Sequence, residues 1–216
     1  MKTGWIITPL ATREDLRWVA GQSADVVLCA DGGLAAARRM GITPHCTLGD
    51  FDSMPLPPPS EPSLCFPSHK DETDSLLCLQ EGLRRGCEAF TVLGGVGGRL
   101  DHSMANLQLL SYALDRGARM SLTGGDTLVT MLPPGEHVLK GYKDAYLSFF
   151  AYTPVVYGLT LCGVAYPLES HTLDYSFPLC VSNRFVDSEA FVSFTEGRLL
   201  AITVRFDSVC SGTYTV

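Results

Sequence analysis

Residues 26–50 read VVLCADGGLAAARRMGITPHCTLGD, and this stretch decides the fold. The apolar run from Val26 to Ala30 predicts a buried strand that leads directly into the acidic turn Asp31-Gly32-Gly33. A short Ala-rich helix then ends at Gly41, and a second strand, Cys46 to Leu48, leads into Gly49-Asp50. Strand, helix and strand in this order are typical of a parallel sheet with crossover helices.

The same alternation of strands and helices continues on both sides of this stretch, as far as Leu132. Thr12-Arg13-Glu14-Asp15 resembles a capping box and predicts a helix that runs to Ala20. Thr73 or Asp71 can cap another helix, and a further helix is expected to begin at about Asp101. The acidic and Gly-rich motifs therefore fall at strand ends or helix starts, the edge where open α/β sheets bind ligands.

The character of the chain changes from Pro133-Pro134-Gly135 onward, because helical periodicity fades and short apolar or aromatic runs alternate with turn residues. The turn Thr195-Glu196-Gly197-Arg198 is typical of a hairpin between the last two runs. The expected strands are Tyr146 to Tyr152, Val155 to Leu161, Phe191 to Phe194 and Leu199 to Phe206. We therefore expect a mostly parallel, Rossmann-like α/β domain over residues 1–132 and an all-β sandwich domain over residues 133–216.

Composition restricts the function. The net charge of −7 argues against a protein that binds nucleic acid or an anionic membrane, because both need a basic surface. We find no signal-peptide pattern at the first residues and no run of about 18 apolar residues that could span a membrane. None of the cysteines has the spacing of a zinc site, so we expect free thiols and a cytoplasmic protein.

Five aspartates fall in three of the motifs. Carboxylates gathered at one place repel one another, so they favour a divalent cation between them, and oxygen ligands suit Mg²⁺ or Ca²⁺ better than Zn²⁺. Three of the five could instead be helix caps. Capping does not explain the first two, which would share one face of an extended segment. The candidate metal ligands are Asp50, Asp52, Asp71, Asp74 and Asp101.

Gly94-Gly95-Val96-Gly97-Gly98-Arg99 is a candidate phosphate loop between a strand and a helix. It lacks the Lys-Ser/Thr end of a Walker loop, and Leu100 stands where the dinucleotide fingerprint needs its third glycine. The glycines alone indicate an ordinary tight turn. With Arg99 and Asp101 attached, the loop favours a phosphate held by backbone N–H groups and a guanidinium. His102 is either a base or part of the helix start.

Covalent catalysis is not supported by the sequence. No Gly-x-Ser-x-Gly elbow occurs, and no cysteine lies in an evident catalytic setting. Taken by itself, the pair Ser182-Asn183 is typical of a turn, because both side chains form local hydrogen bonds to the backbone.

Four motifs in this order closely resemble the thiamine pyrophosphokinase family. They are Ala30-Asp31-Gly32-Gly33, Gly49-Asp50-Phe51-Asp52-Ser53, Lys70-Asp71-Glu72-Thr73-Asp74 and the segment from Gly94 to His102. The resemblance implies an α/β domain followed by a β-sandwich domain, and a homodimer. It also implies transfer of the pyrophosphoryl group of ATP to the thiamine hydroxyl, which gives thiamine diphosphate and AMP. The Ser182-Asn183 pair fits the family's substrate region.

By this resemblance, the five aspartates would hold Mg²⁺ and the triphosphate, and Arg99 would grip the phosphates with the glycines beside it. Asp71 or Asp74 would orient the thiamine hydroxyl or accept its proton. The implied catalytic residues are Asp71, Asp74, Arg99 and Asp101. The implied contacts to ATP or thiamine come from Asp31, Gly32, Gly33, Gly95, Gly97, Gly98, Arg99, His102, Ser182 and Asn183.

Two other functions stay open on the sequence. The same scaffold would suit a Mg-nucleotide-dependent kinase of another small alcohol. It would also suit a nucleotide or thiamine sensor without catalysis, although a simple binder would have little use for so many carboxylates.

Overall fold

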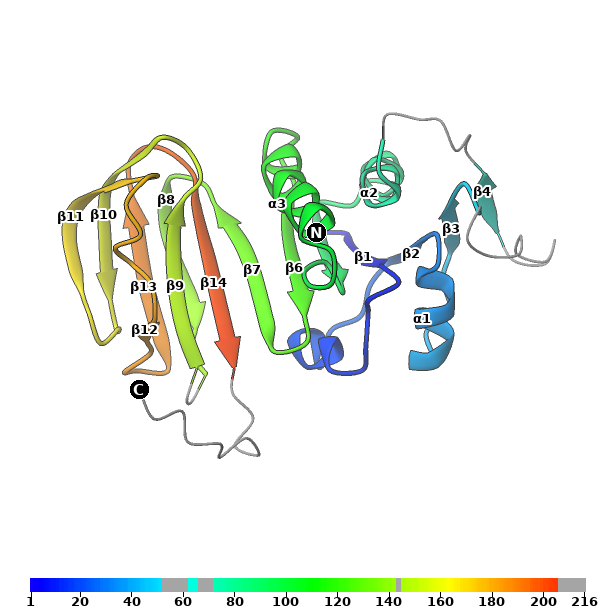
Figure 1. The fold of residues 1–216 in the computed structure, drawn as a ribbon, viewed down its shortest axis with the longest axis horizontal. Helices are drawn as coiled ribbons and strands as arrows, with labels where there is room; N and C mark the ends of the chain where they lie inside the picture. The colour runs from blue at the N-terminus through cyan, green and yellow to red at the C-terminus, as the bar shows by residue number, and fades with distance from the viewer. Residues whose placement is uncertain (52–61, 66–71, 143–144, 206–216) are drawn as a thin grey trace. The chain divides into compact units, whose positions relative to one another are not determined.

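The computed structural model describes residues 1–51, 62–65, 72–142 and 145–205 (Figure 1). Two predicted site residues, Asp52 and Asp71, therefore lie outside the described residues. The chain divides into two units, Met1–Gly125 and Asp126–Val216. The first unit contains both helices and strands, and the described part of the second consists of strands and loops.

The strand, helix and strand predicted over residues 26–50 are confirmed as β2 (Val26–Ala30), α1 (Gly33–Met40) and β3 (Cys46–Gly49). Every residue of β2 is buried, as expected of a parallel strand that is covered on both faces. The helix ends as predicted at Gly41, whose left-handed φ of 75° closes the last turn.

Two longer helices, α2 (Asp74–Arg84) and α3 (Leu100–Leu114), also follow the sequence pattern. The cap of α2 is Thr73, whose hydroxyl accepts a hydrogen bond from the N–H of Leu76 at 3.2 Å. Of the two caps that the sequence offered, Thr73 is therefore confirmed.

The helix predicted from Thr12 to Ala20 is wrong, because this segment forms only a short 3-10 helix, η1 (Asp15–Val19). One capping contact does form, since the Asp15 carboxylate accepts from the N–H of Thr12 at 2.8 Å. Its other oxygen accepts from the Thr123 hydroxyl at 2.6 Å and from the N–H of Gly125 at 3.1 Å. These long-range bonds to a fully buried carboxylate fix the segment and override its local helical pattern.

The sheet of the first unit has the order β6-β5-β1-β2-β3-β4, and each neighbouring pair is parallel. Its other strands are β1 (Thr3–Ile7), β4 (Ser63–Cys65), β5 (Ala89–Leu93) and β6 (Arg119–Gly124). In Figure 1, α2 and α3 lie on one side of this sheet and α1 lies on the other. The expected mixed α/β class is confirmed, and the parallel strands present their carboxyl ends at one edge.

The second unit contains two groups of antiparallel strands. In the first group, β7 (Thr127–Leu132), β9 (Ala145–Ala151), β12 (Asn183–Arg184) and β14 (Leu199–Arg205) follow the order β12-β9-β14-β7. In the second, β8 (Gly135–Lys140), β10 (Val155–Cys162), β11 (Leu168–Asp174) and β13 (Glu189–Phe194) follow the order β11-β10-β13-β8. One apolar core takes side chains from both groups, among them Phe149 and Leu159.

The hairpin predicted between β13 and β14 is wrong. β13 pairs with β8 and β10, whereas β14 pairs with β7 and β9. The turn over residues 195–198 therefore carries the chain from one group of strands to the other. Alternating apolar residues predict where a strand lies, but they do not specify its pairing partner.

β7 falls in the second unit, which begins at Asp126, whereas the expected domain boundary followed residue 132.

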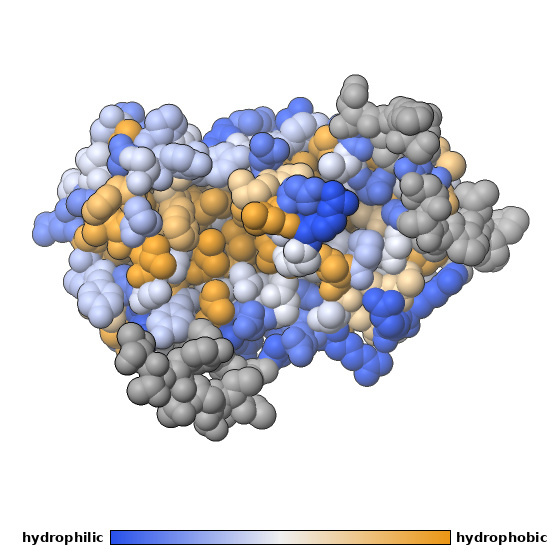
Figure 2. Space-filling view, viewed as in Figure 1, coloured by the Kyte–Doolittle hydropathy of each residue, from blue (hydrophilic) through white to orange (hydrophobic). Residues whose placement is uncertain are grey.

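The surface differs between the two units. Exposed apolar side chains are frequent in the second unit, where Tyr175, Phe177 and Val186 are 62–70% exposed. Figure 2 shows hydrophobic residues gathered on one face over β9 and β14. In the part of the chain that the structure describes, no helix has the length and apolar character needed to cross a bilayer. Free thiols are present at Cys29, Cys46, Cys65, Cys78, Cys87, Cys162 and Cys180.

Candidate active site

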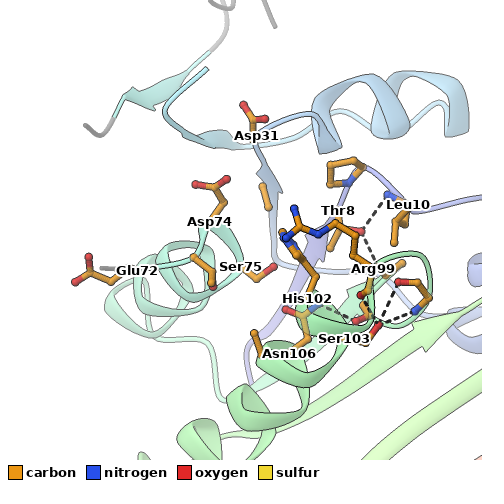
Figure 3. A pocket seen from close by; sticks show the side chains of 17 residues that line it. Thr8, Leu10, Asp31, Glu72, Asp74, Ser75, Arg99, His102, Ser103 and Asn106 are labelled. Atoms are coloured by element: carbon orange, nitrogen blue, oxygen red, sulfur yellow. Dashed lines mark hydrogen bonds between the residues drawn. The ribbon is translucent and has the colours of Figure 1, made fainter. Parts of the chain in front are cut away.

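A pocket of about 390 Å³ opens at the carboxyl edge of the sheet in the first unit. It lies where β1, β2 and β5 end and where α2 and α3 begin (Figure 3). Its lining comes from the turns after these strands and from the first turns of these helices. This is the edge at which the sequence predicted a ligand site.

Asp31 lines the pocket from the end of β2 with a left-handed φ of 41°, a conformation that residues other than glycine adopt uncommonly. Its N–H donates to the carbonyl of Leu48 at 2.7 Å. The neighbouring strand packs closely here, since a Cβ added at Gly49 would stand 2.9 Å from the Cβ of Asp31. The end of β3, which leads into Asp50, is thereby held against Asp31.

The expected face shared by Asp50 and Asp52 needs an extended residue between them, and Asp52 itself lies outside the described residues. Phe51 has a left-handed φ of 57°, and its side chain is buried. A left-handed residue interrupts the two-residue alternation of a strand, so the argument for a shared face fails at Phe51.

The Gly-rich loop follows β5 and is packed tightly at its beginning. At Gly94, φ is 73°, and an added Cβ would stand 2.3 Å from the backbone nitrogen of Ala11, so a larger residue does not fit. From β6, the carbonyl of Thr123 accepts a hydrogen bond from the N–H of Val96 at 3.2 Å. Gly97 has a φ of 118° and open space where a Cβ would stand. The loop is therefore anchored at one end and exposed at the other.

α3 begins beside this loop, and Arg99 at its N-cap position forms no side-chain cap. The first N–H groups of a helix lack helical partners and carry partial positive charge. Arg99 instead makes a two-point ion pair with Asp101, with Nε–Oδ1 at 3.1 Å and Nη2–Oδ2 at 2.5 Å. Hydrogen bonding to Arg99 lowers the pKa of Asp101, and the same contact raises the pKa of Arg99. Both side chains therefore stay charged at neutral pH.

The pocket contains some of the predicted acidic residues. Asp31 and Asp74 line it, together with Glu72, which was not selected from the sequence (Figure 3). Asp50 follows β3, and Asp101 is engaged in its ion pair. Within the described residues, no three His, Cys, Asp or Glu side chains come together as a metal site. The assignments as metal ligands therefore stay predictions.

Two of the predicted glycines and His102 line the same pocket, whereas Gly32, Gly33 and Gly98 are not among its lining residues. Gly95, Gly97, Arg99 and His102 line it. Gly32 and Gly33 form the start of α1 directly after Asp31, and a Cβ added at Gly33 would stand 1.9 Å from the carbonyl oxygen of Ile7. Gly33 therefore has a packing role, whether or not it also contacts a ligand.

Ser182 and Asn183 lie in the second unit, and neither lines this pocket. Asn183 is buried, and its side chain bridges to the backbone of Tyr166, with Nδ2 donating to the carbonyl at 2.8 Å and Oδ1 accepting from the N–H at 2.9 Å. Ser182 has a left-handed φ of 61°, and its N–H donates to the Ser148 hydroxyl. These bonds reach residues far along the chain, and Asn183 begins β12, so the local turn contacts expected from the sequence do not account for them. The predicted substrate role stays a prediction.

Two polar residues of α3, Ser103 and Asn106, line the pocket and were missed in the sequence. A signal for them was present, because Ser103 and Asn106 stand at i+4 and i+7 from Arg99 and so share its helix face. A Gly-rich loop, an arginine and carboxylates around one pocket at the strand ends define the class of α/β proteins that bind phosphorylated ligands.

Comparison with known proteins specifies the family within this class. Residues 20–122 match the family model described as thiamin pyrophosphokinase, catalytic domain, and residues 136–199 match thiamin pyrophosphokinase, vitamin B1 binding domain. A thiamine pyrophosphokinase of Bacillus subtilis is 31% identical over 179 residues, which cover 80% of this chain and 84% of that protein. A thiamin pyrophosphokinase 1 of Caenorhabditis elegans is 25% identical over 173 residues, 75% of this chain and 71% of that protein.

Solved structures agree with these relatives. The crystal structure of thiamine pyrophosphokinase from Bacillus subtilis matches with a TM-score of 0.85 at 27% identity, covering 95% of this chain and 100% of that chain. The structure from Geobacillus thermodenitrificans matches with a TM-score of 0.81 at 28% identity, covering 96% and 99%. The chain belongs to the thiamine pyrophosphokinase family, whose members transfer the pyrophosphoryl group of ATP to thiamine. The resemblance seen in the four sequence motifs is confirmed.

Proposed function

We propose that this chain transfers the pyrophosphoryl group of ATP to thiamine at the pocket of the first unit. The observation that carries the proposal is that the Gly-rich loop, Arg99 at the start of α3, and the carboxylates of Asp31 and Asp74 meet at one pocket. The N–H groups of the loop and the guanidinium of Arg99 can bind a polyphosphate, and the carboxylates can hold the Mg²⁺ that balances its charge. Membership of the family supplies the two substrates.

The phosphate donors would come from the end of the Gly-rich loop and the start of α3. The N–H groups of Val96 and Gly97 already donate to Thr123 and Ser103. The remaining donors are at Gly98, Arg99 and the first two residues of α3, where N–H groups lack helical partners and the helix dipole favours negative charge. The guanidinium of Arg99 adds a charged, two-pronged donor, and Asp101 fixes its plane.

The carboxylates at the pocket are the type of ligand that suits Mg²⁺. This ion prefers oxygen ligands and is commonly held by one or two carboxylates together with substrate phosphates. Asp74 is the described pocket residue that we propose to hold it, and the further predicted ligands are Asp50, Asp52, Asp71 and Asp101. When bound, Mg²⁺ neutralises the charge on the phosphate oxygens.

A carboxylate of the same segment would orient the thiamine hydroxyl or accept its proton, and the candidates remain Asp71 and Asp74. Asp74 is the first residue of α2 and is held in place by the Thr73 cap. A side chain on a capped helix start is well placed for this work, because its backbone is fixed.

For the second unit, we propose that it binds thiamine and joins two chains in a homodimer. The match of residues 136–199 to the vitamin B1 binding model supports the first role, and the exposed apolar side chains over this unit support the second. The core shared by both groups of strands supports a β-sandwich, and helices on both sides of the parallel sheet support a Rossmann-like first unit. Free thiols at seven cysteines support a cytoplasmic location.

The direct test is incubation of the protein with Mg-ATP and thiamine, followed by separation of the nucleotides. We expect AMP and thiamine diphosphate in equal amounts. Formation of ADP would contradict the proposal and indicate a kinase that transfers one phosphoryl group. Nucleotide binding without turnover would indicate a sensor.

Substitution of Asp74 tests whether this pocket is the active site. We expect Asp74→Asn to lower kcat by roughly a hundredfold or more, because the loss of the charge weakens the hold on Mg²⁺ or on the proton. The matched control is Glu88→Gln, which removes a charge at an exposed position outside the pocket and should leave kcat unchanged. Equal kcat values for Asp74→Asn and Glu88→Gln would show that the reaction does not take place at this pocket.

A further inference from the structure

We propose that Ser103 and Asn106 are positioning residues, which hold the Gly-rich loop in the shape that binds the phosphates of ATP. The inference deepens the proposed function and rests on it. Both residues lie on the face of α3 that meets the loop, as Figure 3 shows for the side chains around the pocket.

Ser103 holds the exposed end of the loop at Gly97. Its hydroxyl oxygen accepts a hydrogen bond from the N–H of Gly97 at 3.0 Å. The hydroxyl proton has two acceptors within reach, the carbonyl of Gly97 at 3.1 Å and the carbonyl of Arg99 at 3.3 Å. One side chain therefore engages the backbone of Gly97 on both its donor and its acceptor side.

Asn106 holds the buried part of the same loop at Gly95. Its side-chain amide donates to the carbonyl of Gly95 at 2.7 Å, and the residue is only 8% exposed. Farther along α3, the buried residues are Leu109, Leu110 and Ala113, which pack without polar contacts of this kind. A polar amide on this face is costly to bury unless it is hydrogen-bonded, and here its bond is to the loop.

The two contacts have a consequence for phosphate binding. Gly97 has a φ of 118° and open space on its Cβ side, so packing alone does not fix its conformation. With Gly97 bonded to Ser103 and Gly95 bonded to Asn106, both peptides are drawn toward α3. The loop then keeps Arg99, which lines the pocket, in place before ATP arrives, and less binding energy is lost in ordering it.

The test compares four variants of the full chain: Ser103→Ala, Ser103→Thr, Asn106→Leu and the control Gln108→Ala. Gln108 is exposed on α3 and does not line the pocket. The measurements are kcat, the KM for ATP, the KM for thiamine and the thermal unfolding midpoint. Leucine at 106 keeps the branching of asparagine at Cγ but has no donor, and threonine at 103 keeps the hydroxyl.

We expect Ser103→Ala to raise the KM for ATP by roughly threefold to tenfold, the value of one hydrogen bond. The KM for thiamine and the unfolding midpoint should stay near those of the wild type. Ser103→Thr should restore the KM for ATP, Asn106→Leu should raise it by at least as much as Ser103→Ala, and Gln108→Ala should not change it.

An unchanged KM for ATP in both Ser103→Ala and Asn106→Leu would overturn the inference. So would an equal rise in both KM values, since a general loss of structure would affect the two substrates alike. Both outcomes require that the wild-type enzyme is active. A wild-type chain that forms no AMP would overturn the proposed function instead, so the two failures are distinguishable.

Discussion

The ion pair between Arg99 and Asp101 bears on the role of Asp101. From the sequence, Asp101 is one of five candidate metal ligands. In the structure, its carboxylate is engaged by both prongs of the Arg99 guanidinium and by the N–H of His102 at 3.0 Å. These bonds lower its pKa and align the arginine beside the Gly-rich loop. A role in orienting Arg99 and a role as metal ligand make different predictions.

The substitution Asp101→Asn separates these two roles. If Asp101 orients Arg99, kcat/KM for ATP should fall by roughly tenfold to a hundredfold, because the guanidinium loses its fixed plane. The Mg²⁺ concentration that gives half-maximal rate should not change. A large rise in the Mg²⁺ requirement would instead make Asp101 a metal ligand.

Glu81 provides a second test on a single residue, this time of stability. The Arg84 hydrogen bond, with Arg85 contributing further, lowers the pKa of the buried Glu81 from 4.5 to about 2. The folded chain therefore binds fewer protons at this site than the unfolded chain. The stabilisation is complete above pH 4.5 and is lost as the pH falls toward 2.

We expect Glu81→Gln to lower the free energy of unfolding at neutral pH by on the order of 1–3 kcal/mol. The variant should also lose stability less steeply than the wild type as the pH falls below 4.5. Urea unfolding at several pH values measures both effects. Parallel pH profiles for the two proteins would show that the ion pairs of Glu81 do not stabilise the fold.

Among the elements, η1 is the one whose form depends most on distant contacts. Asp15 is fully buried and accepts hydrogen bonds from Thr12, Thr123 and Gly125. In addition, the indole N–H of Trp18 donates to the carbonyl of Gly125 at 2.9 Å. The element is therefore held to the end of β6 by polar contacts.

We expect Asp15→Ala to lower the free energy of unfolding by roughly 2–4 kcal/mol, because the buried donors at Thr123 and Gly125 would lose their acceptor. Chemical denaturation measures the change. The neighbouring Glu14 is exposed and serves as the control, since Glu14→Ala should stay within about 0.5 kcal/mol of the wild type. Equal effects of the two substitutions would contradict the role given to Asp15.

Local pattern was sufficient for the elements whose contacts are near in sequence. The apolar run of β2, the stop of α1 at Gly41 and the Thr73 cap are all features of residues close together in sequence, and all three were predictable. The 3-10 form of η1 and the separate pairing of β13 and β14 depend on residues far along the chain. The loop contacts of Ser103 and Asn106 were missed for the same reason, because helix spacing shows a shared face but not what that face meets.

At the scale of the whole molecule, the two units have different surfaces and different expected tasks. The pocket belongs to the first unit, and the exposed aromatic and aliphatic side chains gather mainly in the second. Large exposed apolar surfaces on a folded protein commonly mark a site of association.

We expect the protein to be a dimer in solution, with a mass twice that of the 23.4 kDa chain. Light scattering over a range of concentrations measures this mass directly, and covering the apolar residues of the second unit is the physical reason for the expectation. A mass equal to that of one chain at working concentration would contradict it.

The place of β14 has a consequence for how the chain acquires its structure during synthesis. All the described strands of the first unit end before residue 125, so this unit can form while later residues are still being added. β14 is the last described strand, yet it lies between β7 and β9 and pairs with both. The second unit therefore cannot complete its pairing until Arg205 has left the ribosome, and until then β7 and β9 each keep the edge that β14 will pair.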